Sequence, residues 1–513
     1  MVALKQKIGS LLQKDYFRAV VLWPTLFFLF LVLANAKIFR MEYLEYGDIA
    51  LTALQIERAS EFRELVGIYS RGPFNHFGPI SFYYFAAMEL PLAFVKSPHG
   101  RHMLAQALAN LLVVFGIAHI LFRSLGSVRR VQFFLLILLF GLAPLGSGFF
   151  FDIWGPAIIV LPLLWYYLAC MRVGLGESAY IVPATGAAVL VLHNNISGTP
   201  VLVPLMFVSL VLFVRCRRRS GAAVFSGRDA GYATLALLIA LFTSIPPLID
   251  QFAGQHNISR IVSYSLGNTS VRKFDTTAAY VFDFFARPFQ PFFDVPGLFV
   301  MLALFAMLLF HLRSENAFLR LLVPYSILIV FLNLAAALKV PGDMVPHIFW
   351  HSFGLIALII FGAALVLVDA FGQAVGKTEI AFRRAHFHLS WVGLALVCLL
   401  YYRPSLDYDD SAAVFFDQFQ PVRSETYQIY FTPENLEQGA FAAGLALKFY
   451  REGYRVCFPS EWLFVYSGHM ACPTNERLIR LTLQRSDSSL TEPPAQNLFR
   501  LGEREILVSR DTP

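Results

Sequence analysis

The chain is built from long apolar segments separated by short polar ones. Most of these segments are roughly 17–25 residues long, the length of helix that spans a bilayer. The pattern therefore predicts a polytopic α-helical membrane protein with about 11 transmembrane helices. The short alternating segments of a membrane barrel are absent from the sequence. The predicted spans are 19–39, 103–122, 131–151, 155–171, 180–193, 199–214, 230–249, 294–312, 318–338, 347–370 and 387–402.

One further apolar run, at 79–95, decides which loops lie outside. If it crossed the membrane, the later basic loops would fall on the opposite side from the basic N-terminus. If it does not cross, the basic loops at 123–130, 215–228, 311–320 and 377–386 all lie on the side of the N-terminus, as the positive-inside rule requires. We therefore predict that this run dips into the membrane or lies on its outer face.

With this orientation, the outer segments are 40–102, short loops around 152 and 194–199, 250–293, 339–346 and the tail from 403. The predicted spans carry few charges, which argues against an ion-coupled pump. Nearly all the unusual polar residues lie in the outer segments: Asp48, Arg58, Arg71, His76, Asp152, His193, Asn194, Asn195, Asp250, His256, Asn257, Asp343 and His347.

Composition supports this interpretation. Hydrophobic residues make up 57% of the chain and charged residues 15%, against about 25% charged in an ordinary soluble protein. The net charge of +7 comes from arginines in short loops such as 215–220, so it does not indicate a nucleic-acid partner. The first apolar run follows Lys14 and Arg18 and lacks a small-residue cleavage site, so we expect a retained first span.

The first outer loop begins with a predicted helix at 45–67. Leu51, Leu54, Phe62 and Leu65 recur at helical spacing, which is typical of an amphipathic helix on the membrane surface. Asp48 stands at its start, where two interpretations stay open. It caps the helix by accepting hydrogen bonds from first-turn N–H groups, or it is a general base at the boundary between water and lipid.

The stretch YSRGPFNHFGPISFYY at 69–84 places polar residues and two Gly-Pro pairs directly before an apolar run. Such a broken backbone is tolerated at membrane depth where it lines a cavity or is buried in protein. Arg71 and His76 could bind a phosphate there, Arg71 through its planar fork of donors. The alternative is that both only snorkel to the interface or cap local structure.

After Arg403 and Pro404 the composition turns polar. A predicted helix at 432–453 lies among strand-like runs at 426–431, 454–458, 477–483 and 504–510. These elements predict a small extracytoplasmic α/β domain of roughly 100 residues. The chain would then divide into a transmembrane domain, 1–402, and this domain, 403–513.

Cys457 and Cys472 are the two cysteines of the tail. They form a disulfide if the tail faces an oxidising periplasm, or they remain two free thiols. The acidic cluster LDYDDS at 406–411 has no defined calcium-loop spacing, so a solvated linker is the favoured interpretation.

These features together resemble the GT-C superfamily of glycosyltransferases, which use polyprenyl-phosphate-linked sugars at the extracytoplasmic face. The order YGD (46–48), amphipathic helix and HFGPISFYY (76–84) matches the family's catalytic outer loop. The sequence is most similar to a bacterial branch of arabinofuranosyltransferase-like proteins that includes the enzyme that modifies type IV pilin. That similarity rests on the blocks at 69–79, 151–164, 193–205 and 246–261.

The chain departs from that branch at two places. Phe77 stands where a second Pro is usual, and Trp154-Gly155-Pro156 stands where Trp-Asn-Pro is usual. The second departure weakens the transfer of a metal-binding role to the loop of Asp152. This residue is the weak metal candidate, and a helix start beside Pro156 is its favoured role.

The resemblance implies that Asp48 is the catalytic base. It also implies that Arg58, Arg71, His76 and His193 bind the donor phosphate, and that Asn75, Asn194, Asp250 and His347 orient substrate. His347 and His351 would share one helix face without forming a metal site. No cofactor is required, although a divalent cation is left open.

The expected protein is a bacterial cytoplasmic (inner) membrane enzyme with its active site and C-terminal domain on the periplasmic side. Its expected partners are a polyprenyl-phosphate sugar donor, an acceptor glycan, lipid or protein, and membrane lipids. The resemblance implies D-arabinofuranose or another pentose as the sugar. Three alternatives stay open: a lipid-linked oligosaccharide ligase or polymerase, a sugar-lipid flippase, and a non-catalytic assembly protein. The ligase alternative depends on Arg260, Arg272, Lys273 and Arg287 in the loop 251–293.

Overall fold

The computed structural model of the chain describes residues 14–41, 45–221, 223–375, 411–431, 436–466, 470–473, 477–485, 497–501 and 504–510. The chain forms two compact units. The first contains Met1–Ala36, Gln106–Ser244 and Gly267–Ser405. The second contains Lys37–Ala105, Ile245–Leu266 and Leu406–Pro513. The predicted boundary at 402 and 403 lies outside the described residues.

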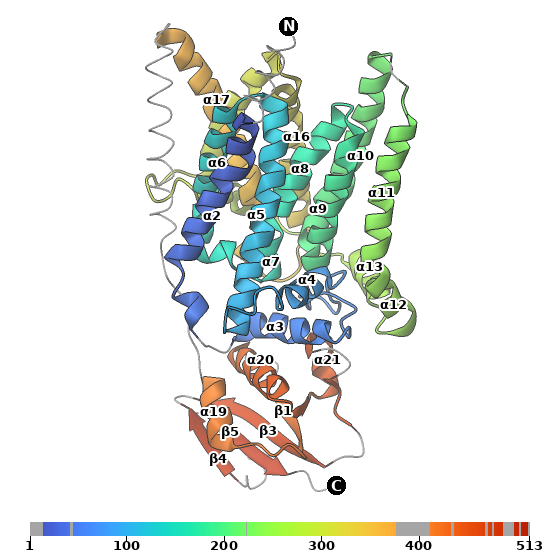
Figure 1. Cartoon of the computed structure of the whole chain (residues 1–513), viewed down its shortest axis with the longest axis vertical. Helices are drawn as coiled ribbons and strands as arrows, with labels where there is room; N and C mark the ends of the chain where they lie inside the picture. The colour runs from blue at the N-terminus through green and yellow to red at the C-terminus, as the bar shows by residue number, and fades with distance from the viewer. Residues whose placement is uncertain are drawn as a thin grey trace. The chain divides into compact units, whose positions relative to one another are not determined.

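The first unit is helical (Figure 1). Its central helix α8 is apolar on all faces and almost wholly buried, and it packs against α9, α10 and α17. The helices are α2 (Trp23–Ala34), most of α5 (Pro98–Leu125), α6 (Val128–Leu142), α7 (Gly155–Ile158), α8 (Val160–Gly174), α9 (Ile181–Asn194), α10 (Thr199–Arg219), α11 (Gly227–Thr243), α14 (Phe274–Ala286), α15 (Gly297–Leu308), α16 (Ala317–Ala337) and α17 (Ser352–Val375).

Within the described part of the chain, 7 helices are long and apolar enough to cross a membrane, or up to 8 if one bent pair is a single span. Two shorter apolar helices, Ser178–Asn194 and Gly297–Arg313, lie at two further predicted spans. Each predicted span from 19–39 to 347–370 therefore has an apolar helix at its place. The span at 387–402 lies outside the described residues, so the total of about 11 stays a prediction.

The apolar run at 79–95 forms only the short helix α4 (Ile80–Met88), which has 9 residues. A helix of this length rises about 14 Å, roughly half the thickness of the hydrocarbon core. The chain then continues through turns to the start of α5. The run therefore forms no helix long enough to cross a membrane, and its placement in or on the outer face stays a prediction.

The second unit carries a five-stranded sheet with the order β2-β1-β3-β5-β4 (Figure 1). Strand β1 pairs in parallel with β2 and β3, whereas β5 pairs antiparallel with β3 and β4. The elements are α3 (Gly47–Ser60), α4, α12 (Ile245–Ala253), α13 (Asn257–Gly267), α19 (Ser411–Phe419), β1 (Thr426–Tyr430), α20 (Leu436–Arg451), β2 (Arg455–Cys457), α21 (Leu463–Tyr466), β3 (Leu478–Arg485), β4 (Asn497–Leu501) and β5 (Arg504–Arg510).

The predicted α/β character of the tail is confirmed. All four predicted strand runs and the predicted helix have counterparts, while β4 and α19 were missed. Thr432 and Pro433, expected to begin the helix, lie outside the described residues, as does almost all of the acidic cluster 406–411.

The apolar face of α3 lies in the core of this α/β fold. Leu51 and Leu54 belong to the same buried cluster as Leu445 of α20 and Leu481 of β3. The expectation that this face rests on the membrane surface is therefore wrong, because the face already packs against protein. Phe62, assigned to the same face, lies beyond the helix end and is 83% exposed.

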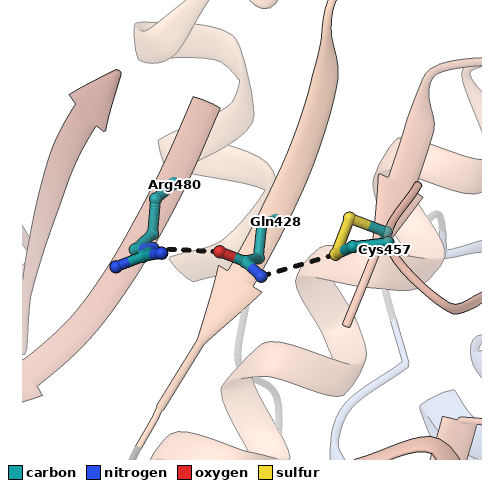
Figure 2. The surroundings of a disulfide bond; sticks show 4 residues. Gln428, Cys457 and Arg480 are labelled. Atoms are coloured by element: carbon teal, nitrogen blue, oxygen red, sulfur yellow. Dashed lines mark hydrogen bonds between the residues drawn. A yellow bond between two sulfur atoms is a disulfide. The ribbon is translucent and has the colours of Figure 1, made fainter. Parts of the chain in front are cut away.

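A disulfide joins Cys457 to Cys472 at the edge of the sheet (Figure 2). The Gln428 amide of β1 donates to the Cys472 sulfur at 3.5 Å and accepts from Arg480 Nε of β3 at 2.9 Å. The disulfide closes the segment 457–472, which carries α21.

Candidate active site

Asp48 is the second residue of α3, and the structure corrects the expectation that it caps this helix. Tyr46 occupies the cap position with an extended backbone, and Gly47 has φ +57°, a conformation that favours glycine. The Asp48 side chain is half-buried, and Oδ1 accepts a hydrogen bond from the Tyr69 hydroxyl at 2.6 Å. Oδ2 has no hydrogen-bond donor among the described residues. One oxygen is therefore held while the other can receive a proton.

Tyr69 orients the Asp48 carboxylate. Burial raises the pKa of the Tyr69 hydroxyl well above its usual value, and the Asp48 carboxylate raises it further. The hydroxyl therefore stays protonated and remains a donor. Arg71 is exposed and lies close enough to Tyr69 for its charge to oppose that rise in pKa. An exposed cation is thus within electrostatic reach of the hydroxyl that binds the carboxylate.

Tyr69 and Arg71 belong to a hairpin-like loop, residues 67–76. Its two sides are joined by the bonds from His76 N to Ile68 O at 2.8 Å and from Gly67 N to His76 O at 3.0 Å. The first of the two Gly-Pro pairs, Gly72-Pro73, lies in the turn of this loop. His76 is buried, and burial lowers its pKa to about 4. It is neutral at pH 7, so it would meet a phosphate as a neutral donor.

Arg58 lies inside the protein with only 2% of its surface exposed. Its Nε contacts Glu64 Oε1 at 3.0 Å, and Nη1 donates to the Tyr466 carbonyl at 3.1 Å. Burial raises the pKa of Glu64 to about 7, and the Arg58 guanidinium opposes that rise. In this geometry Arg58 joins α3 to the segment after it and to α21. Its predicted role at the donor phosphate stays a prediction.

Arg451 of α20 contacts α3 and the residue Glu45 that precedes it. Its guanidinium binds both oxygens of Glu45, at 2.6 and 2.9 Å, and its Nε binds Glu57 at 2.6 Å. Burial alone would raise the pKa of Glu45, but Arg451 and His99 outweigh it and hold this pKa well below its usual value. Gly444 permits the close packing, because a Cβ there would lie 3.0 Å from the Glu45 carbonyl oxygen.

Tyr466 of α21 lies near Asp48 and Tyr69. Its ring is buried and stacks on Phe458 with the ring centroids 3.6 Å apart. Burial raises the pKa of Tyr466, and Tyr69 and Asp48 raise it further, which places all three side chains near one another. Sequence reasoning missed Tyr69, Tyr466 and the pair of Arg451 with Glu45. Tyr69 stood in the Gly-Pro stretch, and Glu45 and Arg451 stood in predicted helices, but no role was assigned to any of them.

Asn75 and Asp250, two predicted substrate-orienting residues, lie next to this loop. The Asn75 backbone N–H donates to Asn257 Oδ1 at 2.8 Å. Asp250 is buried and accepts from the backbone N–H groups of Gln255 and Asn257, at 2.9 and 2.8 Å. Both Asp250 oxygens thus cap the start of α13. Direct contact of either residue with substrate stays a prediction.

The remaining predicted site residues lie in the first unit. Asp152 Oδ1 accepts from Trp154 N at 2.9 Å, directly before α7, which fits the helix-start role. Burial raises the pKa of Asp152 to about 7. His193 is buried near the end of α9, and Asn194 donates to the Leu190 carbonyl at 2.7 Å. The described residues contain no group of three His, Cys, Asp or Glu side chains that could hold a metal ion.

His347 and His351 do not share a helix face, contrary to the sequence expectation. His347 lies in a short 3-10 helix, Pro346–Phe349, and its ring contacts Trp154 with the centroids 4.7 Å apart. His351 precedes α17 and contacts Asn333 Oδ1 at 3.2 Å. The break between the two helices turns the two rings toward different partners.

No protein-family model matches the chain, and no curated protein matches it. Among solved structures, ArnT from Cupriavidus metallidurans bound to undecaprenyl phosphate is similar with a TM-score of 0.58 and 12% identity, over 96% of this chain and 98% of that one. The apo form of ArnT gives a TM-score of 0.56 at 13% identity, over 95% and 97%. The oligosaccharyltransferase AglB from Archaeoglobus fulgidus gives 0.35, too low to establish a shared fold. The chain has the GT-C fold of ArnT, and the predicted fold class is confirmed.

Proposed function

We propose that the protein is a membrane glycosyltransferase that moves a sugar from a polyprenyl-phosphate donor to an acceptor outside the cytoplasm. The observation that carries this proposal is the likeness to ArnT along almost the whole chain, in a structure bound to undecaprenyl phosphate. The half-exposed Asp48 carboxylate supports it, because its geometry suits a general base.

Asp48 would act through the carboxylate oxygen that Tyr69 leaves open. Oδ2 takes the proton of an acceptor hydroxyl while the hydroxyl oxygen attacks the anomeric carbon of the donor sugar. The bond from that carbon to the phosphate oxygen breaks, and its electron pair leaves with the polyprenyl phosphate. This leaving group is stable as an anion, so a strong general acid is unnecessary.

Arg71 would hold the leaving phosphate. Charge grows on the phosphate as the bond breaks, and a fixed cation stabilises it more in the transition state than before. Arg71 suits this task because its guanidinium is exposed beside Tyr69. His76 would be a neutral hydrogen-bond donor in the same region. The buried Arg58 would hold α3 to the segment after it and to α21.

The finer assignments rest on the sequence resemblance. They are D-arabinofuranose as the sugar, a glycan, lipid or pilin-like protein as the acceptor, and the periplasmic face of a bacterial cytoplasmic membrane as the location. The orientation rests on the positive-inside rule, which assigns the arginines in the last turn of α10 to the cytoplasmic side. Purified protein given a panel of polyprenyl-phosphate pentoses and hexoses would identify the sugar by which donor is consumed.

The test of the function is transfer of radiolabelled sugar from a polyprenyl-phosphate donor to an acceptor extract. We expect transfer by the wild type and by Asp417→Asn, since Asp417 is an exposed residue of α19 away from the site. We expect little transfer by Asp48→Asn. Full transfer by Asp48→Asn at equal protein level would overturn the assignment of the base. Movement of the lipid-linked sugar across the membrane without transfer would support a flippase instead.

A further inference from the structure

The pair of helices α12 and α13 buries polar side chains and exposes large apolar ones. Its buried residues include Asp250 and Asn257, which are 3% and 2% exposed. Its most exposed residues include Phe252 and Leu266, each 82% exposed, with Ile249 and Val262 beside them on the same helices. A helix pair in water shows the opposite arrangement, because exposed apolar surface is unfavourable there.

The buried side chains of Asp250 and Asn257 are hydrogen-bonded. Asp250 accepts from the backbone of the turn between the helices and caps α13. The Asn257 side chain accepts from Asn75 N at 2.8 Å and donates to Asn75 O at 3.0 Å. The amide thus satisfies both backbone groups of one residue in the loop 67–76, as a neighbouring strand would.

A second contact joins α13 to the same loop. The rings of Phe74 and Tyr264 lie with their centroids 5.0 Å apart. Gly72 makes room for this contact, since a Cβ there would lie 2.5 Å from the Phe74 ring and 3.1 Å from the Tyr264 ring. The loop that carries Tyr69 and Arg71 is therefore fixed to α13 by both polar and apolar contacts.

The position of α12 in the chain, directly after a membrane-spanning candidate, indicates what surrounds the exposed apolar face. Only Ser244 separates α12 from α11, an apolar helix that counts with α12 as one candidate membrane span. A chain that leaves the membrane through α12 brings this face to the lipid boundary. Exposed Arg260 on α13 adds a cation that suits phospholipid headgroups.

We propose that α12 and α13 lie in the outer lipid interface with their apolar face in the bilayer, and that Asn257 thereby holds the loop 67–76 at the lipid boundary. The occupant of the face is bilayer lipid. The lipid contact is independent of the catalytic proposal. The consequence for Tyr69 and Arg71 rests on the proposed function, because it would place the phosphate-binding loop at the depth of a lipid-linked phosphate.

The lipid contact is tested with nitroxide labels on the full chain in phospholipid nanodiscs. Labels at Phe252→Cys and Leu266→Cys are compared with one at Asp417→Cys, after replacement of Cys170, Cys216 and Cys398 by Ala. Power saturation with oxygen and a water-soluble nickel chelate reports the surroundings of each label. We expect oxygen to dominate at 252 and 266 and nickel at 417. Nickel access at 252 and 266 would overturn the proposal, and so would shielding from both reagents, which would indicate a protein partner.

The link through Asn257 is tested with a label at Pro73→Cys, an exposed position of the loop. We expect Asn257→Ala to raise the mobility of this label while oxygen access at 252 stays unchanged. Ser259→Ala, on the same helix, is the matched control and should leave both unchanged. If label mobility at 73 is the same in Asn257→Ala and Ser259→Ala, the link is wrong. If the protein proves active, we also expect Asn257→Ala to raise KM for the donor about tenfold, the effect of losing one buried hydrogen-bond pair.

Discussion

The Tyr69 hydroxyl donates to Asp48 Oδ1 at 2.6 Å. This bond joins the start of α3 to the Gly-Pro loop, two features that the sequence placed in order but not in contact. It fixes one carboxylate oxygen and leaves the other for the acceptor. A base with one oxygen oriented and one open is the arrangement that proton abstraction requires.

Replacement Tyr69→Phe removes that hydroxyl and keeps the ring. We expect kcat to fall about tenfold with KM for the donor little changed, because the carboxylate loses orientation and one charge-assisted hydrogen bond. Steady-state kinetics of sugar transfer measures kcat and KM separately. Tyr430→Phe in β1 is the matched control and should behave like the wild type. An equal loss in both variants would show that ring substitutions in this unit act only through folding.

Replacement Arg451→Gln leaves Glu45 buried without its cation. We expect the free energy of unfolding to fall by about 3–5 kcal/mol, the usual effect of breaking a buried pair. Thermal or denaturant unfolding in detergent measures this loss. Lys448→Gln on the same helix breaks only a pair at the surface and should cost less than about 1 kcal/mol. Equal stability of the two variants would contradict the role given to Arg451.

The stability of the protein should depend on His76 in mildly acidic solution. Its pKa is lowered by burial from 6.5 to about 4, so between these values the unfolded state binds a proton that the folded state does not. His76 therefore makes the folded state lose stability as the pH falls from 6.5 to 4, by at most about 3 kcal/mol. We expect His76→Asn to weaken the pH dependence of the melting temperature between pH 4 and 6.5. Replacement of the exposed His256 by Asn should leave this pH dependence unchanged. The same slope in both variants would contradict the burial of a neutral His76.

The disulfide should stabilise the segment that carries Tyr466. Its cysteines are 15 residues apart, and closing a loop of this size contributes about 3 kcal/mol. We expect Cys457→Ser with Cys472→Ser to unfold the C-terminal domain at lower denaturant and to reduce transfer. Cys216→Ser, which removes a free thiol, is the control. Unchanged unfolding and transfer in the double variant would show that the disulfide does not support the site.

Much of the fold follows from local patterns. Hydrophobic periodicity located the apolar helices, α3, α20 and four strands, because each has a face to bury. It misassigned the partner of that face for α3, since Leu51 and Leu54 suit lipid and protein cores equally. It missed β4, which lies at a sheet edge. A cap was one of two interpretations of Asp48, but the cap is Tyr46, two residues earlier, and Gly47 with φ +57° is the first residue of the helix.

The site itself was only half predictable. The resemblance singled out Asp48 and Arg71 because both belong to short motifs. Tyr466 and Arg451 come from sequence positions roughly 400 residues later, and no local pattern states that they approach α3. The identity of such partners is decided by packing of the second unit, including the close approach at Gly444.

The central claim is that Asp48 removes the acceptor proton, and single-turnover transfer from a saturating polyprenyl-phosphate sugar donor tests it most directly. We predict that Asp48→Asn lowers this rate by about 10²–10⁴, the range of general-base catalysis, while donor binding and the melting temperature stay those of the wild type. A rate in Asp48→Asn within about threefold of the wild type and of Asp417→Asn would contradict the account, because a threefold loss is far smaller than the contribution of a general base.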